Sequence, residues 1–363
     1  MNKIEFKFKI KIIFILILFI LLCFVASTIA TARTAKIKTF KIATYNVENL
    51  FDIDYNKNEY KAYHPNTKYG WNKNMLDIKV SNIAKVIKNL NADVIALQEI
   101  ESKKALDFLG HKLKKLNINY SYVAIADSKP TSVKCAVLSK FPIISKKEIQ
   151  VNNKLTRNIL KITLNIHENH LVLFINHWKS KKGPESLRIN YAKALKKEIN
   201  KLENTSDFIL LGDFNSNYNE YKTFKNSKKL NNTNNITGIN HILKTCKNSK
   251  MVNEKILRKQ KQNEYLYNLW LEINKSKRWS CFFRKKNTLD NIILAKGLYD
   301  NKGISYVDNS FDKFMEDYLF KNKKKNANCI YRWQRTKKGK GRHLGKGYSD
   351  HLPIFAYFSI NCH

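Results

Sequence analysis

Side chains that can bind metal ions or transfer protons gather beside six short hydrophobic runs, where a strand would begin or end. Four of these polar groups follow a run and two precede one. The groups are Tyr45-Asn46-Val47-Glu48, Gln98-Glu99, Asn176-His177-Trp178-Lys179-Ser180, Gly212-Asp213-Phe214-Asn215, Leu289-Asp290-Asn291 and Ser349-Asp350-His351. Each group has an ordinary explanation when taken alone, since Asn46 is a turn former and Glu99 can cap a helix. A lone Asp-His pair is likewise more often structural than catalytic.

Taken together, the six groups contain the side chains that hydrolysis of a phosphodiester needs. Loops at strand ends are where a rigid sheet presents reactive groups. Carboxylate, amide and imidazole groups without thiolates suit a hard cation such as Mg²⁺ rather than zinc. Phosphodiester hydrolysis requires a metal ion to offset phosphate charge, an activated water and donors to the phosphoryl oxygens. The set can supply all three.

Hydrophobic periodicity predicts the elements that would position these groups. Strands and helices are interleaved, but several strands are joined by hairpins, which favours an α/β sandwich with two packed mixed sheets inside and helices outside, in four layers. Strands are expected at residues 36–47, 93–97, 120–126, 134–138, 157–166, 170–177, 207–211, 289–295 and 353–359, and helices at residues 76–90, 102–116 and 184–202.

Two segments show no clear periodicity. Residues 216–250 are rich in Asn and Lys, and residues 321–347 are rich in Lys, Arg and Gly. We interpret both as long loops inserted into a single catalytic domain over residues 36–363, because long loops in compact domains are often functional.

The N-terminal segment has the pattern of a targeting signal. A mainly basic start precedes an uncharged apolar run at residues 12–26, and Ala30-Thr31-Ala32 resembles a cleavage site. The run is short for a bilayer span, which needs about 20 residues. Residues 1–32 are therefore predicted to be a signal peptide or an uncleaved membrane anchor. The protein would be periplasmic, secreted, or held at the inner membrane.

The charge balance favours anionic partners. Lys and Arg number 67 against 29 Asp and Glu, which gives a formal net charge of +38. A field this positive attracts nucleic acid, acidic lipid surfaces or anionic glycans, and it carries no sequence specificity. No protein partner is indicated, and a monomer is expected.

The motifs, in this order and spacing, resemble the endonuclease/exonuclease/phosphatase family. That family includes DNase I-like nucleases, abasic-site nucleases, sphingomyelinases and inositol polyphosphate 5-phosphatases. The matching residues run from Thr44-Tyr45-Asn46 to Ser349-Asp350-His351-Leu352-Pro353. The stretch from Asn176 to Gly183 and the tripeptide Arg278-Trp279-Ser280 resemble exported bacterial nucleases of the family. The resemblance implies a DNase I-like fold.

The resemblance also implies a metal site. Glu99 would be the principal ligand, with Asn46 and Asp350 nearby and Glu48 as a further ligand. The implied ion is Mg²⁺, with Mn²⁺ and Ca²⁺ as alternatives.

The same resemblance assigns the catalytic roles. Asp213 would orient or deprotonate the attacking water, and Asn215 would hold that water or the phosphate. His351 would contact the scissile phosphate and be kept cationic by Asp290, because a neighbouring carboxylate favours the imidazolium. His177 could protonate the leaving oxygen.

Three basic residues are expected to bind the substrate. Arg157 matches a phosphate-contacting Arg of the DNase I-like members. Lys179 follows the His177 motif, and Arg342 lies in a loop where basic residues alternate with aromatic residues and glycine. Such a loop could follow a nucleic-acid backbone and stack bases, although a solvated Lys-rich loop would have the same composition. Asp127 lies near the place where some members carry a Glu that partners the histidine.

Three functions remain open at this point. The first is an exported, metal-dependent nuclease with little sequence preference, which cleaves DNA, with RNA as an open alternative substrate. The second is a sphingomyelinase or phospholipase C-like phosphodiesterase, which should expose an apolar hairpin for lipid insertion, and no clear one is evident. The third is a non-catalytic DNA-binding surface protein, which would need neither Asp213 nor His177.

Overall fold

The computed structural model describes residues 36–151 and 156–362. The chain divides into two compact units, Thr39–Ile360 and Met1–Lys38 with Asn361–His363. The expected signal or anchor segment, residues 1–32, lies outside the described residues. Within the described ranges, no helix is long and apolar enough to cross a membrane. The features below belong to the unit Thr39–Ile360, apart from residues 36–38 and 361–362 at the outer ends of two strands.

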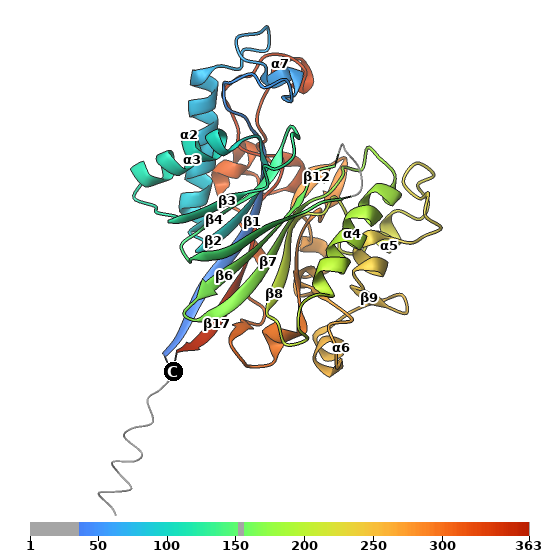
Figure 1. Cartoon of the computed structure of the whole chain (residues 1–363). Helices are drawn as coiled ribbons and strands as arrows, with labels where there is room; N and C mark the ends of the chain where they lie inside the picture. The colour runs from blue at the N-terminus through green and yellow to red at the C-terminus, as the bar shows by residue number, and fades with distance from the viewer. Residues whose placement is uncertain (1–35, 152–155, 363) are drawn as a thin grey trace, which may run out of the picture. The chain divides into compact units, whose positions relative to one another are not determined.

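Two large mixed sheets form the centre of this unit (Figure 1). One has seven strands in the order β15-β17-β1-β2-β4-β3, with β16 paired to β17, and the other has six in the order β11-β14-β8-β7-β6-β5. The first sheet comprises β1 (Lys36–Leu50), β2 (Val94–Ile100), β3 (Tyr122–Ile125), β4 (Lys134–Ser139), β15 (Ile304–Tyr306), β16 (Asp312–Lys313) and β17 (Ile354–Cys362). The second comprises β5 (Ile143–Ile149), β6 (Ile159–Ile166), β7 (Asn169–His177), β8 (Phe208–Asp213), β11 (Tyr267–Asn268) and β14 (Asp290–Leu294).

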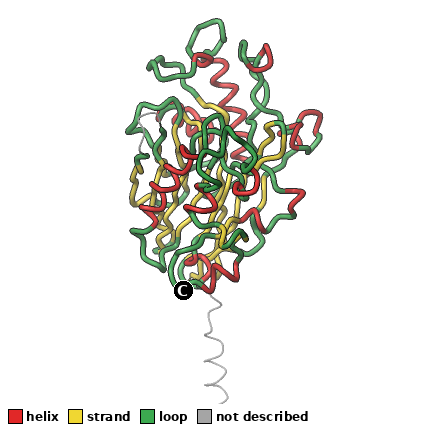
Figure 2. The backbone as a smooth tube through the Cα atoms, turned by 90° about the vertical axis from the view of Figure 1, so that its right-hand side faces the viewer, coloured by secondary structure: helices red, strands yellow, loops and turns green. Residues whose placement is uncertain are grey.

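Helices cover the outer faces of both sheets. Helices α2 (Lys73–Leu90) and α3 (Lys103–Lys115) share an apolar core with β1 and β2. Helix α4 (Glu185–Ile199) packs its buried face against β7 and β8. Together with the two sheets these helices make four layers, which confirms the predicted α/β sandwich. Figure 2 shows the chain after a 90° turn, so that the layers lie one behind another.

The starts of α2 and α3 follow from their sequences. The Asn72 side chain accepts a hydrogen bond from the Met75 N–H at 3.0 Å, and the Ser102 hydroxyl accepts one from the Ala105 N–H at 2.9 Å. Both contacts satisfy backbone donors that a helix start leaves unpaired. Asn91 ends α2 in the left-handed conformation, which Asn tolerates well.

All nine predicted strands and all three predicted helices have counterparts in the structure. Strand β5 was not anticipated, because Ser145, Lys146 and Lys147 interrupt its apolar pattern. It is an edge strand, where exposed charges discourage further pairing.

The two segments expected to be long loops contain short elements. Residues 216–250 hold α5 (Glu220–Thr223), a π-helical turn (Gly238–Ile242) and β9 (Cys246–Lys247). Residues 321–347 hold 3₁₀ turns at Lys321–Lys323 and Ala327–Cys329, and α7 (Thr336–Gly339). The remaining short elements are β10 (Lys250–Met251), α6 (Glu254–Lys259), β12 (Cys281–Phe283) and β13 (Lys285–Asn287), with 3₁₀ turns at Lys61–Tyr63, Leu269–Leu271, Lys275–Lys277, Lys296–Tyr299 and Asp317–Leu319.

His343 ties the segment 321–347 to the segment that follows β1. Its Nδ1 lies 2.8 Å from Trp333 Nε1, and its Nε2 lies 2.8 Å from the carbonyl oxygen of Ala62. Because an indole N–H can only donate, Nδ1 must accept and Nε2 must carry the proton. The structure therefore requires a neutral imidazole, and burial lowers the pKa of His343 to about 4.

This arrangement predicts an acid-sensitive contribution to stability. Protonating His343 breaks the Trp333 contact and adds a positive charge near Arg335 and Lys79. The contribution of neutral His343 to the unfolding free energy is therefore complete above about pH 6.5 and is lost as the pH falls toward the folded pKa of about 4. Between pH 7 and pH 5 the wild type should lose about 2 kcal/mol more of its unfolding free energy than His343→Gln, whose amide can make both contacts without titrating. Urea denaturation at both pH values measures the difference. An equal loss of unfolding free energy in the wild type and in His343→Gln would contradict the assignment of a neutral His343.

Candidate active site

The strand register brings three of the predicted residues into one row. His177 at the end of β7 lies opposite Asp213 at the end of the parallel strand β8. Asp213 lies in turn opposite Asp290, at the start of the antiparallel strand β14. In the other sheet, Asn46 on β1 lies opposite Gln98, next to Glu99. The ends of β1, β2, β7 and β8 thus present polar groups at the same edge of the two packed sheets (Figure 1).

Backbone irregularities aim the acidic and amide side chains of this edge. The β1–β2 register shifts after Asn46, and the β2–β4 register shifts around Glu99. Glu48, Glu99 and Asn215 have φ values of 53°, 69° and 48°. Bulges next to active sites re-aim side chains, and a positive φ in a residue other than glycine is a strained conformation that functional sites often contain.

Gly212 allows β7 and β8 to approach closely just before Asp213. Its φ is +125°, and a Cβ at this position would lie 2.1 Å from the carbonyl oxygen of Asn176. Only glycine fits such a contact. The glycine of the Gly-Asp-Phe-Asn motif is therefore required by packing, and it places Asp213 beside His177.

Asn46 joins two carboxylates at the centre of the site. Its Nδ2 lies 3.2 Å from Glu99 Oε1 and 3.1 Å from Asp213 Oδ2. His177 Nε2 lies 3.6 Å from the same oxygen of Glu99 and 3.7 Å from the same oxygen of Asp213. Asn215 holds Asp213 from the other side, through its backbone N–H to Oδ1 at 2.8 Å and its Nδ2 to Oδ2 at 3.3 Å.

Burial controls the protonation of this cluster. Burial raises the pKa of Asp213 to about 7, although the positive charge of His351 acts to lower it. Burial also raises the pKa of Glu99. It lowers the pKa of His177 well below the usual value, in the same direction as the charges of Arg157 and His351. Two acids that are costly to ionise and a neutral imidazole share one buried space.

His351 and Asp290 form the opposite wall of this space. His351 Nδ1 lies 2.8 Å from Asp290 Oδ2, which also accepts a hydrogen bond from Ser280 Oγ at 2.5 Å. Burial alone would lower the pKa of His351, but Asp290 and Asp213 outweigh it and raise this pKa well above the usual value. The geometry therefore holds an imidazolium with Nε2 left over for another partner.

Cys281 completes a buried trio with Asp290 and His351 whose ligand atoms lie within 4.8 Å of one another. Burial raises the pKa of the Cys281 thiol to about 12, so it remains protonated at neutral pH. A protonated thiol and an occupied Asp290 oxygen make this trio a poor metal site.

Comparison with known proteins identifies the family. The sequence pattern of the endonuclease/exonuclease/phosphatase family matches residues 41–251 and 244–360. The chain belongs to this family. Its members are metal-dependent phosphodiester hydrolases. No curated protein sequence matches the chain significantly.

Solved structures agree on the fold. Humanized TDP2 from D. rerio is 13% identical, with a TM-score of 0.52 over 88% of this chain and 98% of that one. D. rerio TDP2 complexed with a single strand DNA product has the same identity and TM-score over 88% and 99% of the two chains. A family protein from Beutenbergia cavernae is 12% identical, with a TM-score of 0.50 over 89% and 72%. The likeness confirms the DNase I-like architecture.

The metal site that the family implies finds suitable ligands on this chain. Glu99 and Asn46 already converge beside Asp213, the expected base, and both acids are costly to ionise without a compensating cation. Asp350 lies at the same edge, with its Oδ1 4.0 Å from His351 Nε2. Oxygen donors from carboxylate and amide groups fit Mg²⁺ or a similar hard cation.

Glu48, which the family resemblance suggested as a further metal ligand, instead accepts hydrogen bonds from Arg332 and Trp333. Arg332 donates to Glu48 Oε1 from Nε at 2.9 Å and also from Nη2, and the Trp333 N–H donates to Oε2 at 3.1 Å. Arg332 Nη2 lies 3.0 Å from Asp350 Oδ2 as well. Sequence reasoning missed Arg332, because nothing in a basic loop indicates which of its residues turns inward.

The residues expected to bind substrate have different surroundings. Arg157 donates from Nε to the carbonyl of His177 at 3.1 Å and from Nη2 to that of Trp178 at 2.8 Å, so it holds the chain directly after β7. Lys179 lies in the loop that continues from there. In the described structure Arg342 contacts none of the catalytic side chains; it lies beside Gly70, where a Cβ would be 3.3 Å from its Nε.

The histidine partner expected at Asp127 is also absent from the described contacts. Asp127 forms an ion pair with Lys146 at 3.0 Å. His177 Nδ1 is buried and has no hydrogen-bond partner within the described residues. The ring of His177 is therefore oriented by its packing and by the carboxylates at Nε2.

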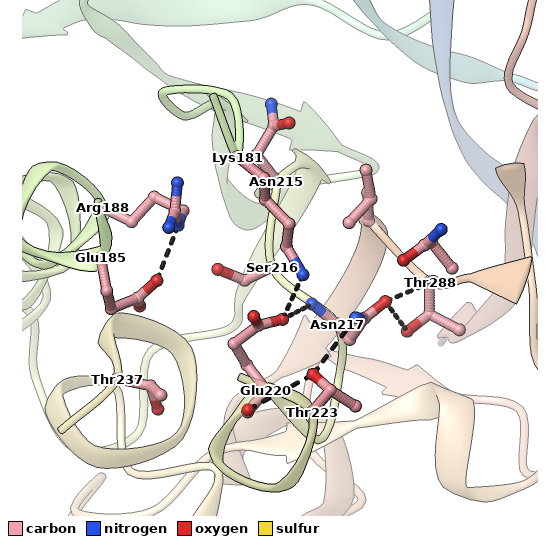
Figure 3. A network of polar contacts seen from close by, with 12 residues as sticks. Lys181, Glu185, Arg188, Asn215, Ser216, Asn217, Glu220, Thr223, Thr237 and Thr288 are labelled. Carbon is pink, nitrogen blue, oxygen red and sulfur yellow. Dashed lines mark hydrogen bonds and ion pairs between the residues drawn. The ribbon is translucent and has the colours of Figure 1, made fainter. Parts of the chain in front are cut away.

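A buried ion pair anchors the loop after His177 (Figure 3). Arg188 Nε lies 2.7 Å from Glu185 Oε2, and both side chains are fully buried. Arg188 Nη1 donates to the carbonyls of Lys179 at 3.2 Å and Ser180 at 3.1 Å. Lys181 is paired in turn with Glu220 Oε2 at 2.6 Å. The sequence predicted the helix that carries Arg188 but not this network.

Proposed function

We propose that the protein is an exported, metal-dependent nuclease with little sequence preference that cleaves DNA, with RNA as a further candidate substrate. The observation that carries this proposal is the cluster of buried Asn46, Asp213 and His177 with the partly exposed Glu99, facing the His351–Asp290 pair. A binding protein would have no use for buried carboxylates next to an imidazolium. The net charge of +38 and the single strand DNA product bound to D. rerio TDP2 favour a nucleic-acid substrate.

Each residue has a role that its contacts allow. Glu99, Asn46 and Asp350 would hold a divalent cation such as Mg²⁺, which offsets charge on the phosphate. Asp213, kept in place by Asn215, accepts a proton from the attacking water. His351 donates from Nε2 to a phosphoryl oxygen, because Asp290 occupies its Nδ1. His177 donates a hydrogen bond from Nε2 to the leaving oxygen.

Metal binding can be measured without any substrate. Because Glu99 accepts a hydrogen bond from Asn46 at 3.2 Å and lies 3.6 Å from His177, Glu99→Gln should weaken metal binding by removing one of the two central charges. Mn²⁺ should raise the melting temperature of the wild type and have at most a small effect on the variant. Glu168→Gln, in the exposed turn between β6 and β7, is the matched control. An identical Mn²⁺ shift in wild type and Glu99→Gln would rule out this ligand assignment.

The nuclease proposal predicts cleavage of DNA by the purified protein. Plasmid DNA should be nicked and degraded with Mg²⁺ and remain intact with EDTA. Single-stranded RNA under the same conditions tests the wider substrate range. Plasmid that stays intact with Mg²⁺, Mn²⁺ and Ca²⁺ would refute the proposal.

Export is part of the same proposal, with residues 1–32 as its signal or anchor. Mass spectrometry of the protein from culture fluid and from membranes would show whether the segment is removed. Intact protein found solely in the cytosol would refute export and leave the nuclease proposal standing.

A further inference from the structure

A basic cavity of about 580 Å³ lies directly beside the active site. Its walls come from the chain after β1, from the loop before α4 and from the segment 321–347. The residues used below are Glu48, Tyr60, Lys182, Lys321, Arg335 and Lys338, all of which line it. Its volume falls within the range of roughly 300–1,000 Å³ that is usual for ligand pockets.

Two residues connect the basic cavity to the proposed chemistry. Arg332 lines the cavity and reaches both Glu48 and Asp350. Tyr60 is close enough to Arg157 and Glu99 for their charges to shift the pKa of its phenol, although burial is the larger cause and raises that pKa. A molecule in the basic cavity would therefore adjoin the phosphate that the cation at Asp350 and Glu99 would bind.

The charge in the basic cavity is not balanced by the protein. Its acid, Glu48, is neutralised by Arg332. Lys182, Lys321 and Lys338 form no ion pair with a carboxylate of the described residues, and neither does Arg335. Four cations around one cavity with no internal counter-charge favour an anionic occupant.

The wall that carries Arg335 and Lys338 is a built structure. The segments 331–336 and 341–348 are joined by backbone hydrogen bonds, including Gln334 N to the Lys346 carbonyl at 2.8 Å. A Cβ on Gly347 would lie 2.0 Å from the Arg332 carbonyl oxygen, so the two segments are in close contact there. Lys338 has a φ of 51°, a strained value that fixes where its side chain leaves the backbone.

Resting on the proposed nuclease function, we propose that the basic cavity binds the nucleotide next to the scissile phosphate of a single strand. Its phosphate would lie among Lys182, Lys321, Arg335 and Lys338, and its base would stack on Tyr60, a residue that is 43% exposed. Base stacking on an aromatic side chain beside a cationic groove is the usual mode of single-strand binding. A nucleotide enclosed in this cavity is separated from a complementary strand, so single strands and frayed ends are favoured over continuous duplex.

Binding without cleavage tests the basic cavity by itself. A fluorescent single-stranded oligonucleotide is titrated with the full chain in EDTA over a range of salt concentrations. The double variant Lys182→Gln/Lys338→Gln should bind about tenfold more weakly and lower the log–log salt slope by about 1.4. The control Lys114→Gln/Lys115→Gln removes the same charge from exposed positions at the end of α3. Equal weakening in both variants would overturn the proposal, because general charge would then explain it.

Kinetics give the second readout. Two substrates are compared: a short single-stranded oligonucleotide, and bis(4-nitrophenyl) phosphate, which lacks a neighbouring nucleotide. The ratio of kcat/KM for the first to kcat/KM for the second should fall about tenfold in Lys182→Gln/Lys338→Gln and in Tyr60→Ser. An unchanged ratio, with DNA still cleaved, would overturn the cavity assignment and leave the nuclease function intact. A wild type that cleaves neither substrate would instead refute the nuclease function, and the binding titration would still decide whether the cavity takes a nucleotide.

Discussion

His351→Gln is expected to lower kcat for DNA cleavage by about 10³-fold. The imidazolium lies against Asp290 at 2.8 Å and has one N–H left for the phosphoryl oxygen. Glutamine can offer an amide N–H to the phosphate but carries no positive charge, so stabilisation of the developing negative charge is lost. Single-turnover kinetics on an oligonucleotide, with the variant shown to be folded by its melting curve, measure the effect.

A double variant separates a catalytic pair from a merely structural one. If Asp290 acts through His351, then His351→Gln/Asp290→Asn should be no slower than His351→Gln, because residues that act as a unit are not additive. Asp290→Asn by itself should shift the alkaline limit of the pH–rate profile to lower pH, since the carboxylate raises the pKa of His351. Losses that multiply in the double variant, with no shift in the profile, would contradict the pairing.

Asp213→Asn is the second change with a large expected effect, a loss of about 10³-fold in kcat. The substitution is isosteric, and the new side-chain oxygen can still accept the Asn215 N–H that Asp213 Oδ1 accepts at 2.8 Å. The change therefore removes the proton acceptor for the attacking water and keeps the Asn215 backbone contact. It loses the contacts that Asn46 and Asn215 donate to Oδ2, so the variant must be shown to be folded by its melting curve. Since burial raises the pKa of Asp213 to about 7, wild-type activity should rise as the pH increases through this range.

The same strand offers a matched control. Asp207 directly precedes β8, at the end opposite to Asp213, and burial raises its pKa to about 7 as well. It accepts a hydrogen bond from the Ile304 N–H at 3.0 Å, far along the strand from the catalytic cluster. Asp207→Asn should leave kcat unchanged. Equal losses from the two substitutions would mean that Asp213 acts on stability and not on the reaction.

The fold and the family could be predicted from the sequence because their signals are local. Buried strands such as Phe208–Asp213 are continuous apolar runs, and α2 repeats its apolar residues at helical spacing. The polar groups at the strand ends retain residue types and order that are jointly specific to the family. The register of β7, β8 and β14 then places His177, Asp213 and Asp290 side by side.

Other features of the site could not be predicted, because they depend on contacts between distant segments. Nothing in the sequence indicates that Glu48 pairs with Arg332, 284 positions away along the chain. The left-handed backbone of Glu99 and the deep burial of Arg188 also arise from packing in three dimensions. Composition suggested that the segment 321–347 binds nucleic acid, and the structure adds a cavity through which it could do so.

Substrate choice provides the most direct test of the central claim. The purified full chain is given single-stranded DNA and sphingomyelin vesicles separately, each with Mg²⁺, beside an Asp213→Asn control. The account predicts a kcat/KM for DNA that exceeds that for sphingomyelin and depends on both Mg²⁺ and Asp213. Faster turnover of sphingomyelin, or DNA bound without cleavage, would contradict it.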